Sequence, residues 1–132
     1  MQPQGDIALV GLAVMGQNFI LNMNDKGYTV VAYNRDTSKV ERFLANEAKG
    51  TKIIGATSIQ DMVSKLKRPR RVVLLVKAGV AVDEMAAQIA PHLEKGDIII
   101  DAGNSLYADT NRRVKEYADK GILYVGSGIS GG

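Results

Sequence analysis

The sequence predicts an α/β protein with a Rossmann-like, doubly wound parallel sheet in a three-layer α/β/α arrangement. Two observations predict this fold class. Short apolar runs alternate with amphipathic segments along the chain, and the connections between them are short, which favours right-handed crossovers between parallel strands. The first apolar run also leads directly into a glycine-containing turn that opens an amphipathic segment. This order of strand, tight turn and helix is typical of the fold.

Five strands are expected, each an apolar run bounded by residues that break regular structure. They span residues 6–10, 29–33, 71–76, 97–101 and 122–125. The first is a nearly continuous apolar run, as in strands that are buried on both faces of a sheet. The second is rich in β-branched residues, which favour extended structure. Residues 51–58 are expected to be irregular, with a short extended piece at 52–54.

Helices are expected between the strands, and their ends carry residues that cap or stop helices. They span about residues 14–26, 38–49, 59–66, 80–90 and 107–120. In the first, apolar residues recur at spacings of three and four, and Gly27 follows it as a stop. Thr37 or Ser38 is expected to cap the second helix, and Ser58 the third. Pro91 stops the fourth, because proline cannot continue a helix.

Composition limits the class of protein. The chain has 132 residues, of which 45% are hydrophobic and 23% charged, which suits one domain with its own core. The absence of cysteine excludes disulfides, thiol chemistry and cysteine metal sites. A net charge of +3 suits anionic small molecules and is too weak to indicate nucleic acid. No apolar run approaches the roughly 20 residues of a membrane span and no signal peptide is evident, so we expect a cytoplasmic protein without a membrane partner.

The turn at Gly11–Gly16 predicts a dinucleotide site. Its pattern is Gly-x-Ala-x-x-Gly, in which Gly11 permits a sharp turn out of the strand. Ala13 keeps its side chain small where a pyrophosphate approaches the backbone, and Gly16 lets the helix pack closely on the strand. The helix start offers unpaired N–H groups and a positive dipole end to an anion. An ordinary glycine-rich turn is the alternative, but the position between strand and helix favours the cofactor site.

Small and polar residues gather at the edge where the strands end, and ligands of an open parallel sheet bind at that edge. The segments that leave the strands there are 11–16, 34–36, 77–79, 102–105 and 126–132. Asn34 occupies the position where an NAD site usually has Asp or Glu. The next residue, Arg35, has a guanidinium that suits a 2′-phosphate. We therefore expect NADP to be preferred, although Asp36 opposes a phosphate and Arg35 alternatively fits a solvated loop.

Two further polar residues lie at the same predicted edge. Lys77 closes an apolar strand, where it either faces the cofactor or reaches solvent. Asn104 stands between a glycine and a serine after the fourth strand, and its amide can donate and accept near a nicotinamide or a substrate hydroxyl. An Asx turn or a helix cap is the alternative for Asn104.

Other charged residues are expected to be structural. His92, the only histidine, precedes the fourth strand and so lies at the opposite edge, where a solvated loop histidine is expected. No cluster has the spacing of a metal site. The basic run at 65–71 lies at that same opposite edge, and no aromatic residues interleave it for base stacking. We therefore interpret it as a loop and expect no nucleic-acid partner.

Five motifs span essentially the whole chain in a fixed order. They are Gly11-Leu12-Ala13-Val14-Met15-Gly16-Gln17-Asn18, Asn34-Arg35, Leu75-Val76-Lys77-Ala78-Gly79, Asp101-Ala102-Gly103-Asn104-Ser105 and Val125-Gly126-Ser127-Gly128-Ile129-Ser130-Gly131-Gly132. Together they resemble the decarboxylating 6-phosphogluconate dehydrogenase family. Members of that family oxidise the C3 hydroxyl of 6-phosphogluconate with NADP, and loss of carbon dioxide then yields ribulose 5-phosphate.

The resemblance implies a role for each motif. The first would hold the pyrophosphate, the second and the residue after it the adenosine ribose and 2′-phosphate, and the third would line the cofactor cleft. The implied NADP-binding residues are Gly11, Leu12, Ala13, Val14, Met15, Gly16, Asn34, Arg35, Asp36, Val76, Lys77, Ala78 and Asn104. The implied substrate-binding residues are Asn104, Ser130, Gly131 and Gly132.

The sequence departs from the family pattern at two positions. Asp36 stands where the family usually has Thr, which affects the preference for NADP, and Ala102 stands where it usually has Gly. The resemblance places the family's catalytic lysine and glutamate beyond Gly132, in a mostly helical region, so no catalytic residue is expected here.

We therefore expect residues 1–132 to be the NADP-binding domain of a longer protein, because the chain stops on a glycine-rich turn after a strand. The resemblance implies that the whole protein is a homodimeric enzyme of the pentose phosphate pathway and of gluconate utilization. A non-catalytic NADP-binding or sensing module, and a β-hydroxyacid dehydrogenase with another substrate, remain alternatives.

Overall fold

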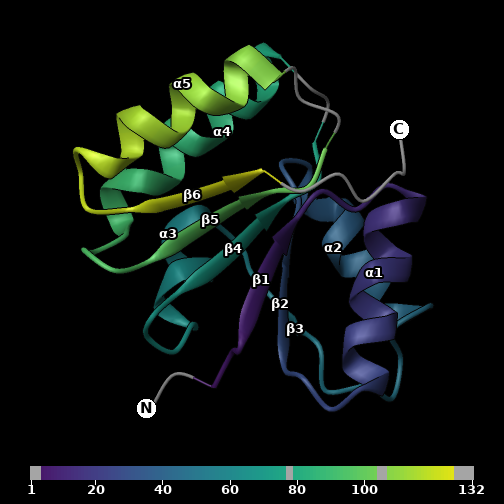
Figure 1. The fold of residues 1–132 in the computed structure, drawn as a ribbon. Helices are drawn as coiled ribbons and strands as arrows, with labels where there is room; N and C mark the ends of the chain where they lie inside the picture. Colours follow the sequence, from purple (N-terminus) through teal and green to yellow (C-terminus); the bar gives the residue numbers. More distant parts are fainter. Residues whose placement is uncertain (1–3, 77–78, 104–106, 127–132) are drawn as a thin grey trace.

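In the part of the chain that the structure describes, six parallel strands form one sheet in the order β3-β2-β1-β4-β5-β6 (Figure 1). The computed structural model describes residues 4–76, 79–103 and 107–126. The strands are β1 (Ile7–Val10), β2 (Val30–Tyr33), β3 (Ile54–Gly55), β4 (Arg71–Leu74), β5 (Ile98–Asp101) and β6 (Leu123–Gly126). The helices are α1 (Val14–Asp25), α2 (Thr37–Ala45), α3 (Ile59–Ser64), α4 (Val80–Ile89), the 3₁₀ turn η1 (Ala90–His92) and α5 (Tyr107–Ala118).

The strand order confirms the predicted Rossmann-like fold, because the chain winds outward from β1 in both directions. β1 pairs with β2 on one side and with β4 on the other, so the direction of winding changes between β1 and β4. The extended piece expected at 52–54 is instead the two-residue strand β3, which pairs with β2. At such a switch point the loops after the strands separate and leave a crevice for a ligand.

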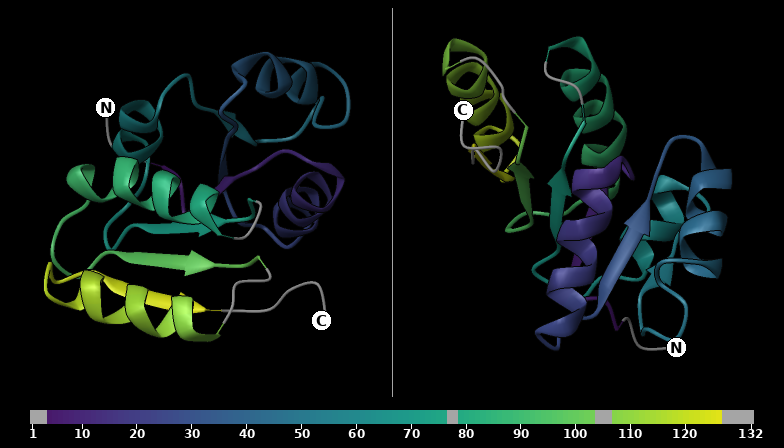
Figure 2. Two further views of the ribbon diagram at one scale, coloured as in Figure 1. Left: turned by 90° about the horizontal axis from the view of Figure 1, so that it is seen from above. Right: turned by 90° about the vertical axis from the view of Figure 1, so that its right-hand side faces the viewer.

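Helices cover both faces of the sheet (Figure 2). On one face, buried residues of α3, α4 and α5 pack on β1, β2 and β4, with Met62, Ile89 and Tyr117 among them. On the other face, Ile20 of α1 and Phe43 of α2 pack on the remaining side chains of the same strands. Alternate residues of β1 therefore enter different cores, which explains why the strand is apolar throughout.

The cap of α2 corrects the prediction of Thr37 or Ser38. Asp36 has an extended backbone and occupies the N-cap position, and its side chain accepts a hydrogen bond of 3.1 Å from the Ser38 backbone N–H. The helix ends at Ala45, earlier than expected, since the chain leaves helical geometry at Asn46. For α3 the prediction is confirmed, because Ser58 Oγ accepts a bond of 3.0 Å from a backbone N–H in the first turn.

Among the residues that the structure describes, no helix is both long and apolar enough to cross a membrane.

Candidate functional site

Both glycines of the Gly11–Gly16 turn are required by close backbone contacts. Gly11 has a φ of +115°, which L side chains rarely adopt, and a Cβ atom there would collide with the Leu75 carbonyl oxygen. A Cβ atom on Gly16 would collide with the Gly11 carbonyl oxygen. The strand–turn–helix unit can therefore close this tightly only with glycine at both positions.

The start of α1 presents backbone N–H groups that no side chain of the cap satisfies. Ala13 occupies the N-cap position in an extended conformation and makes no side-chain capping bond, and no acidic residue lies in the first turn. Val14 and Met15 are exposed beside it. Because four N–H groups at a helix start lack intrahelical partners, this end of α1 suits an anion such as a pyrophosphate.

Asn34 connects the glycine turn to the end of β2. Its Oδ1 atom accepts a hydrogen bond of 2.9 Å from the Leu12 backbone N–H. Its Nδ2 atom donates to the Asp36 carbonyl oxygen at 3.1 Å. An amide can make both bonds at once and a carboxylate cannot, so the choice of Asn here also serves the loop conformation.

Gln17 supports the same turn and was missed at the sequence level. Its Nε2 atom donates to the Leu12 carbonyl oxygen at 2.8 Å. Both backbone polar groups of Leu12 are therefore bonded by side chains, the N–H by Asn34 and the C=O by Gln17. The only available signal was a polar residue directly after Gly16, which is too common to identify such a contact.

Arg35 and Asp36 are both exposed at the end of β2. The Asp36 carboxylate accepts hydrogen bonds from Ser38, at 2.6 Å from the hydroxyl and 3.1 Å from the backbone N–H. These bonds lower the pKa of Asp36, the hydroxyl contributing most. The negative charge next to Arg35 is thus directed toward the start of α2, where the helix dipole also favours it.

A pocket of about 180 Å³ lies between the turn after β1, the end of β2 and α4. Its lining residues are Val10, Gly11, Asn34, Arg35, Val76, Ala81, Glu84, Met85 and Gln88. Apolar side chains of Val76, which follows β4, and of Ala81 and Met85 in α4 line it together with Gly11 and the polar side chains of Asn34 and Arg35. Such a site suits a flat heterocycle, with Arg35 placed for an attached anion.

A second, more open groove of about 490 Å³ lies between the start of α1 and α2. Its lining includes Leu12, Ala13 and Val14 together with two cationic residues, Lys39 and Arg42. The two hollows adjoin the glycine turn from either side. Together they make this region the best candidate for holding an elongated, negatively charged ligand.

The structure brings together four of the predicted site residues, Gly11, Asn34, Arg35 and Val76, around the first pocket. Lys77, Ala78, Asn104, Ser130, Gly131 and Gly132 lie outside the described residues. Val14, Met15 and Asp36 are at the same edge of the sheet but do not line this pocket. The ligand contacts of all these residues stay predictions.

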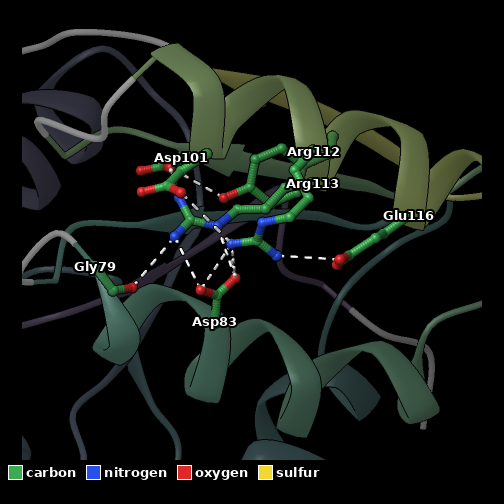
Figure 3. A network of polar contacts seen from close by, with 8 residues as sticks. Gly79, Asp83, Asp101, Arg112, Arg113 and Glu116 are labelled. Atoms are coloured by element: carbon green, nitrogen blue, oxygen red, sulfur yellow. Dashed lines mark hydrogen bonds and ion pairs between the residues drawn. The ribbon is translucent and has the colours of Figure 1, made fainter.

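A buried charge network lies beyond the pocket, and sequence reasoning missed it (Figure 3). Arg113 of α5 is wholly buried and donates to Asp83 of α4 at 2.8 Å, to the Gly79 carbonyl at 3.2 Å and to Asp101 at 3.5 Å. Its hydrogen bonds lower the pKa of Asp83 to about 2. The pairing with Asp83 also raises the pKa of Arg113. Nothing in the sequence indicated that Arg113 is buried, because the segment around it is strongly polar and resembles a solvent-exposed helix.

At the opposite edge of the sheet, the basic run is held by carboxylates. Lys65, Lys67, Arg68 and Arg70 form ion pairs with Asp61, Asp6, Glu94 and Asp97, respectively. His92 is exposed in η1 at the same edge. Among the described residues, no three His, Asp or Glu side chains form a group that could hold a metal ion.

The chain is similar to known proteins along almost its whole length. A family model described as the NAD binding domain of 6-phosphogluconate dehydrogenase matches residues 6–132. The decarboxylating 6-phosphogluconate dehydrogenase 2 of Saccharomyces cerevisiae is 67% identical over 128 residues, which are 97% of this chain and 26% of that protein. The human decarboxylating enzyme is 66% identical over 129 residues, or 98% of this chain and 27% of that protein. The chain thus spans about a quarter of the length of these relatives.

Solved structures give the same result for the fold. The Plasmodium falciparum 6-phosphogluconate dehydrogenase, solved as apo form, with NADP+ and with 6-phosphogluconate, superposes with a TM-score of 0.83 at 43% identity. That superposition covers 90% of this chain and 26% of the other. An imine reductase from Aspergillus terreus has a TM-score of 0.82 at 19% identity, covering 99% of this chain and 43% of its own. The second likeness concerns the fold alone.

Proposed function

Because the chain belongs to the 6-phosphogluconate dehydrogenase family, we propose that residues 1–132 are the NADP-binding domain of an enzyme that oxidises and decarboxylates 6-phosphogluconate. The product is ribulose 5-phosphate. The observation that carries the proposal is the Gly11–Gly16 turn, whose Leu12 N–H is bonded by Asn34 while Arg35 stands at the mouth of the adjacent pocket. The NADP+ complex of the Plasmodium relative supports the choice of cofactor.

The geometry supports a specific arrangement of NADP. The pyrophosphate would lie at the start of α1, where the backbone N–H groups point outward from the sheet edge. The adenine would occupy the pocket beside Val76 and Met85. Arg35 would bind the 2′-phosphate with its planar set of donors, and Lys39 in the neighbouring groove adds positive charge.

The nicotinamide end would extend toward the loops after β4 and β5. We propose that Lys77 and Ala78 line this end of the cleft, and that Asn104 contacts both the nicotinamide and the substrate. Ser130, Gly131 and Gly132 would contribute to the substrate site. The bound cofactor supplies the hydride acceptor, and these residues fix the reacting carbon near it.

The acid and the base of the reaction are proposed to come from outside this chain. Among the described side chains at the carboxyl edge, Asp101 is buried and bonded by Tyr124, and Asp36 caps α2. A general base has to reach the proton that it removes, and these two carboxylates are committed to structural contacts. Glu84 is exposed and lines the pocket that we assign to the adenine, away from the proposed nicotinamide end. We propose that a mostly helical second domain supplies the catalytic groups and the dimer interface.

The wider assignment follows from the same proposal. The full-length protein would be a cytoplasmic homodimer of the pentose phosphate pathway and of gluconate utilization, with 6-phosphogluconate as its small-molecule partner. The length of the relatives, about four times that of this chain, supports a further domain.

Absorbance of NADPH tests the function when 6-phosphogluconate and NADP are given to the full-length protein and, separately, to the 132-residue chain. We expect turnover by the full-length protein and none by the short chain. NADP binding without turnover by the full-length protein would favour a sensing module, and turnover of another β-hydroxyacid alone would favour a related dehydrogenase. Turnover by the repurified short chain would contradict the placement of acid and base.

A further inference from the structure

The Asp101 carboxylate joins the loop after β5 to two anchoring side chains. Its Oδ1 atom accepts a hydrogen bond of 3.2 Å from the Gly103 backbone N–H. Its Oδ2 atom accepts one of 3.0 Å from the Tyr124 hydroxyl and faces the Arg113 guanidinium at 3.5 Å. One oxygen therefore holds the loop while the other is fixed from β6 and α5, so the carboxylate cannot rotate without losing one of these contacts.

Arg113 extends this network to the loop after β4. Its Nη2 atom donates to the Gly79 carbonyl at 3.2 Å, directly before α4 begins, and to Asp83 at 3.1 Å. The two loops also approach each other through their backbones, because a Cβ atom on Gly103 would lie 3.0 Å from the Val76 carbonyl oxygen. Asp101, Arg113 and Tyr124 thus clamp both loops with buried groups, and we name these three residues the loop clamp.

We propose that the loop clamp is a positioning device for the nicotinamide half of the cofactor, a proposal that rests on the dehydrogenase function above. The sheet order places β1 and β2 on one side of the crevice and β4 and β5 on the other. The glycine turn, Asn34 and Arg35 belong to the first side and would hold the adenosine half. The clamped loops belong to the second side, and Gly103 directly precedes Asn104 in the chain.

The chemistry of the network fits a positioning role. The Arg113 guanidinium and the Asp101 carboxylate are both buried, and in such a low-dielectric region hydrogen bonds are strong and their geometry is strict. Burial raises the pKa of Tyr124, so its hydroxyl stays a donor to Asp101. Asp101, Arg113 and Tyr124 are all buried, so the clamp does not face a ligand directly. Its effect on a ligand would therefore pass through the loop backbone.

The test compares two ligands in the full-length protein: NADP, and 2′,5′-ADP, which lacks the nicotinamide half. Tyr124→Phe is the deciding variant, because it removes one hydroxyl and keeps the buried ring. Arg113→Lys keeps the charge but cannot reproduce the planar fork. Lys115→Arg is the matched control on the same helix, where the side chain is exposed. Calorimetry gives both dissociation constants, and thermal unfolding checks the fold.

For Tyr124→Phe we expect the dissociation constant of NADP to rise by about threefold to tenfold and kcat to fall by about tenfold, since small misplacements of reacting groups are costly. The constant for 2′,5′-ADP should stay within about twofold of wild type, as should every value for Lys115→Arg. Arg113→Lys should repeat the pattern of Tyr124→Phe with larger effects.

Equal weakening of NADP and 2′,5′-ADP would overturn the proposal in favour of a general structural role, and so would unchanged NADP binding and kcat in a folded Tyr124→Phe protein. Measurements of NADP binding and 6-phosphogluconate turnover by the wild-type protein distinguish a failure of this inference from a failure of the proposed function. Binding of NADP without 6-phosphogluconate turnover would reject the function, while the ratio of the two dissociation constants still tests the clamp. Absence of NADP binding in the wild type would reject both.

Discussion

The Oδ1 atom of Asn34 accepts a 2.9 Å hydrogen bond from the backbone N–H of Leu12, which ties the end of β2 to the turn after β1. Leu12 follows Gly11, the residue that turns the chain out of β1 against the Leu75 carbonyl. One amide side chain thus sets the relative position of the two segments proposed to hold the pyrophosphate and the 2′-phosphate. The predictions below start from this relationship.

Replacement of Asn34 should weaken cofactor binding through the loop conformation. Asn34→Ala leaves the half-buried Leu12 N–H without its acceptor, so we expect the affinity for NADP to fall about tenfold and the unfolding free energy to fall by about 1–2 kcal/mol. Asn111→Ala, on the exposed surface of α5, is the control and should change neither. Calorimetry and urea denaturation measure the two effects, and an Asn34→Ala protein with wild-type NADP affinity would contradict the role of this bond.

Arg35 should determine the preference for NADP over NAD. A hydrogen bond to a charged group contributes about 1.5–3 kcal/mol, so Arg35→Ala should lower the affinity for NADP by roughly ten- to a hundredfold. The affinity for NAD, which lacks the 2′-phosphate, should change little. Arg71→Ala, an exposed arginine at the opposite edge of the sheet, controls for net charge. If NADP and NAD bind equally to the wild-type chain, the assignment of Arg35 is wrong.

A comparison of alanine substitutions at Gly11 and Gly27 distinguishes the cost of backbone strain from the cost of a close backbone contact. Gly11 and Gly27 have φ values of +115° and +95°, but only Gly11 has backbone atoms in the space that a Cβ would occupy. Gly27→Ala should therefore cost about 1–2 kcal/mol for the strained backbone alone. Gly11→Ala should destabilise the fold more than that and abolish NADP binding. Equal losses of unfolding free energy, with NADP binding retained, would show that the Leu75 contact does not restrict the turn.

Acid should weaken the pairing between α4 and α5. Hydrogen bonds from Arg113 lower the pKa of Asp83 from 3.8 to about 2. A carboxyl group whose pKa is lower in the folded state stabilises the fold above its unfolded pKa, and this stabilisation is lost as the pH falls through the folded value. Between about pH 4 and pH 2, the unfolding free energy of the wild-type chain should fall more steeply than that of Asp83→Asn.

Urea denaturation at several pH values checks the acid dependence. Asp119→Asn serves as the matched control, because Asp119 is exposed in the turn after α5. It should keep the steep wild-type slope. If the unfolding free energy of Asp83→Asn fell with pH as steeply as that of the wild type, the ion pair with Arg113 would not contribute to the pH dependence of stability.

Much of the fold was predictable from local signals. Apolar runs, helical spacing and glycine stops are properties of neighbouring residues. Within the residues that the structure describes, they located the five α-helices and five of the six strands to within a few residues, and they did not predict η1. The exceptions are β3 and the cap of α2. β3 has only two residues, and it is extended because it pairs with β2. The cap of α2 depends on a backbone conformation at Asp36 that the sequence does not reveal, since Thr37 and Ser38 are equally good capping residues.

From the sequence, the candidate site could be predicted only as a set of segments that follow the strands at the carboxyl edge of the sheet. The glycine turn and Arg35 carry chemistry that their residue types disclose. The residue types of Asn34 and Arg113 do not reveal their hydrogen-bond partners, because Leu12 lies 22 residues from Asn34 and Asp83 lies 30 residues from Arg113. Such contacts follow from the strand order and the packing of helices. The burial of Arg113, on a helix that is otherwise strongly polar, therefore needed the structure.

The central claim, that the carboxyl edge of the sheet binds NADP at the glycine turn, is tested most directly by a titration of the isotope-labelled chain with NADP, followed by amide chemical shifts. We expect the largest changes at Gly11, Leu12 and Arg35, with weaker changes for NAD. The amides of Gly27 and Gly96, which lie at the opposite edge, should not move. No shift change at millimolar NADP, or changes concentrated at the opposite edge, would contradict the account.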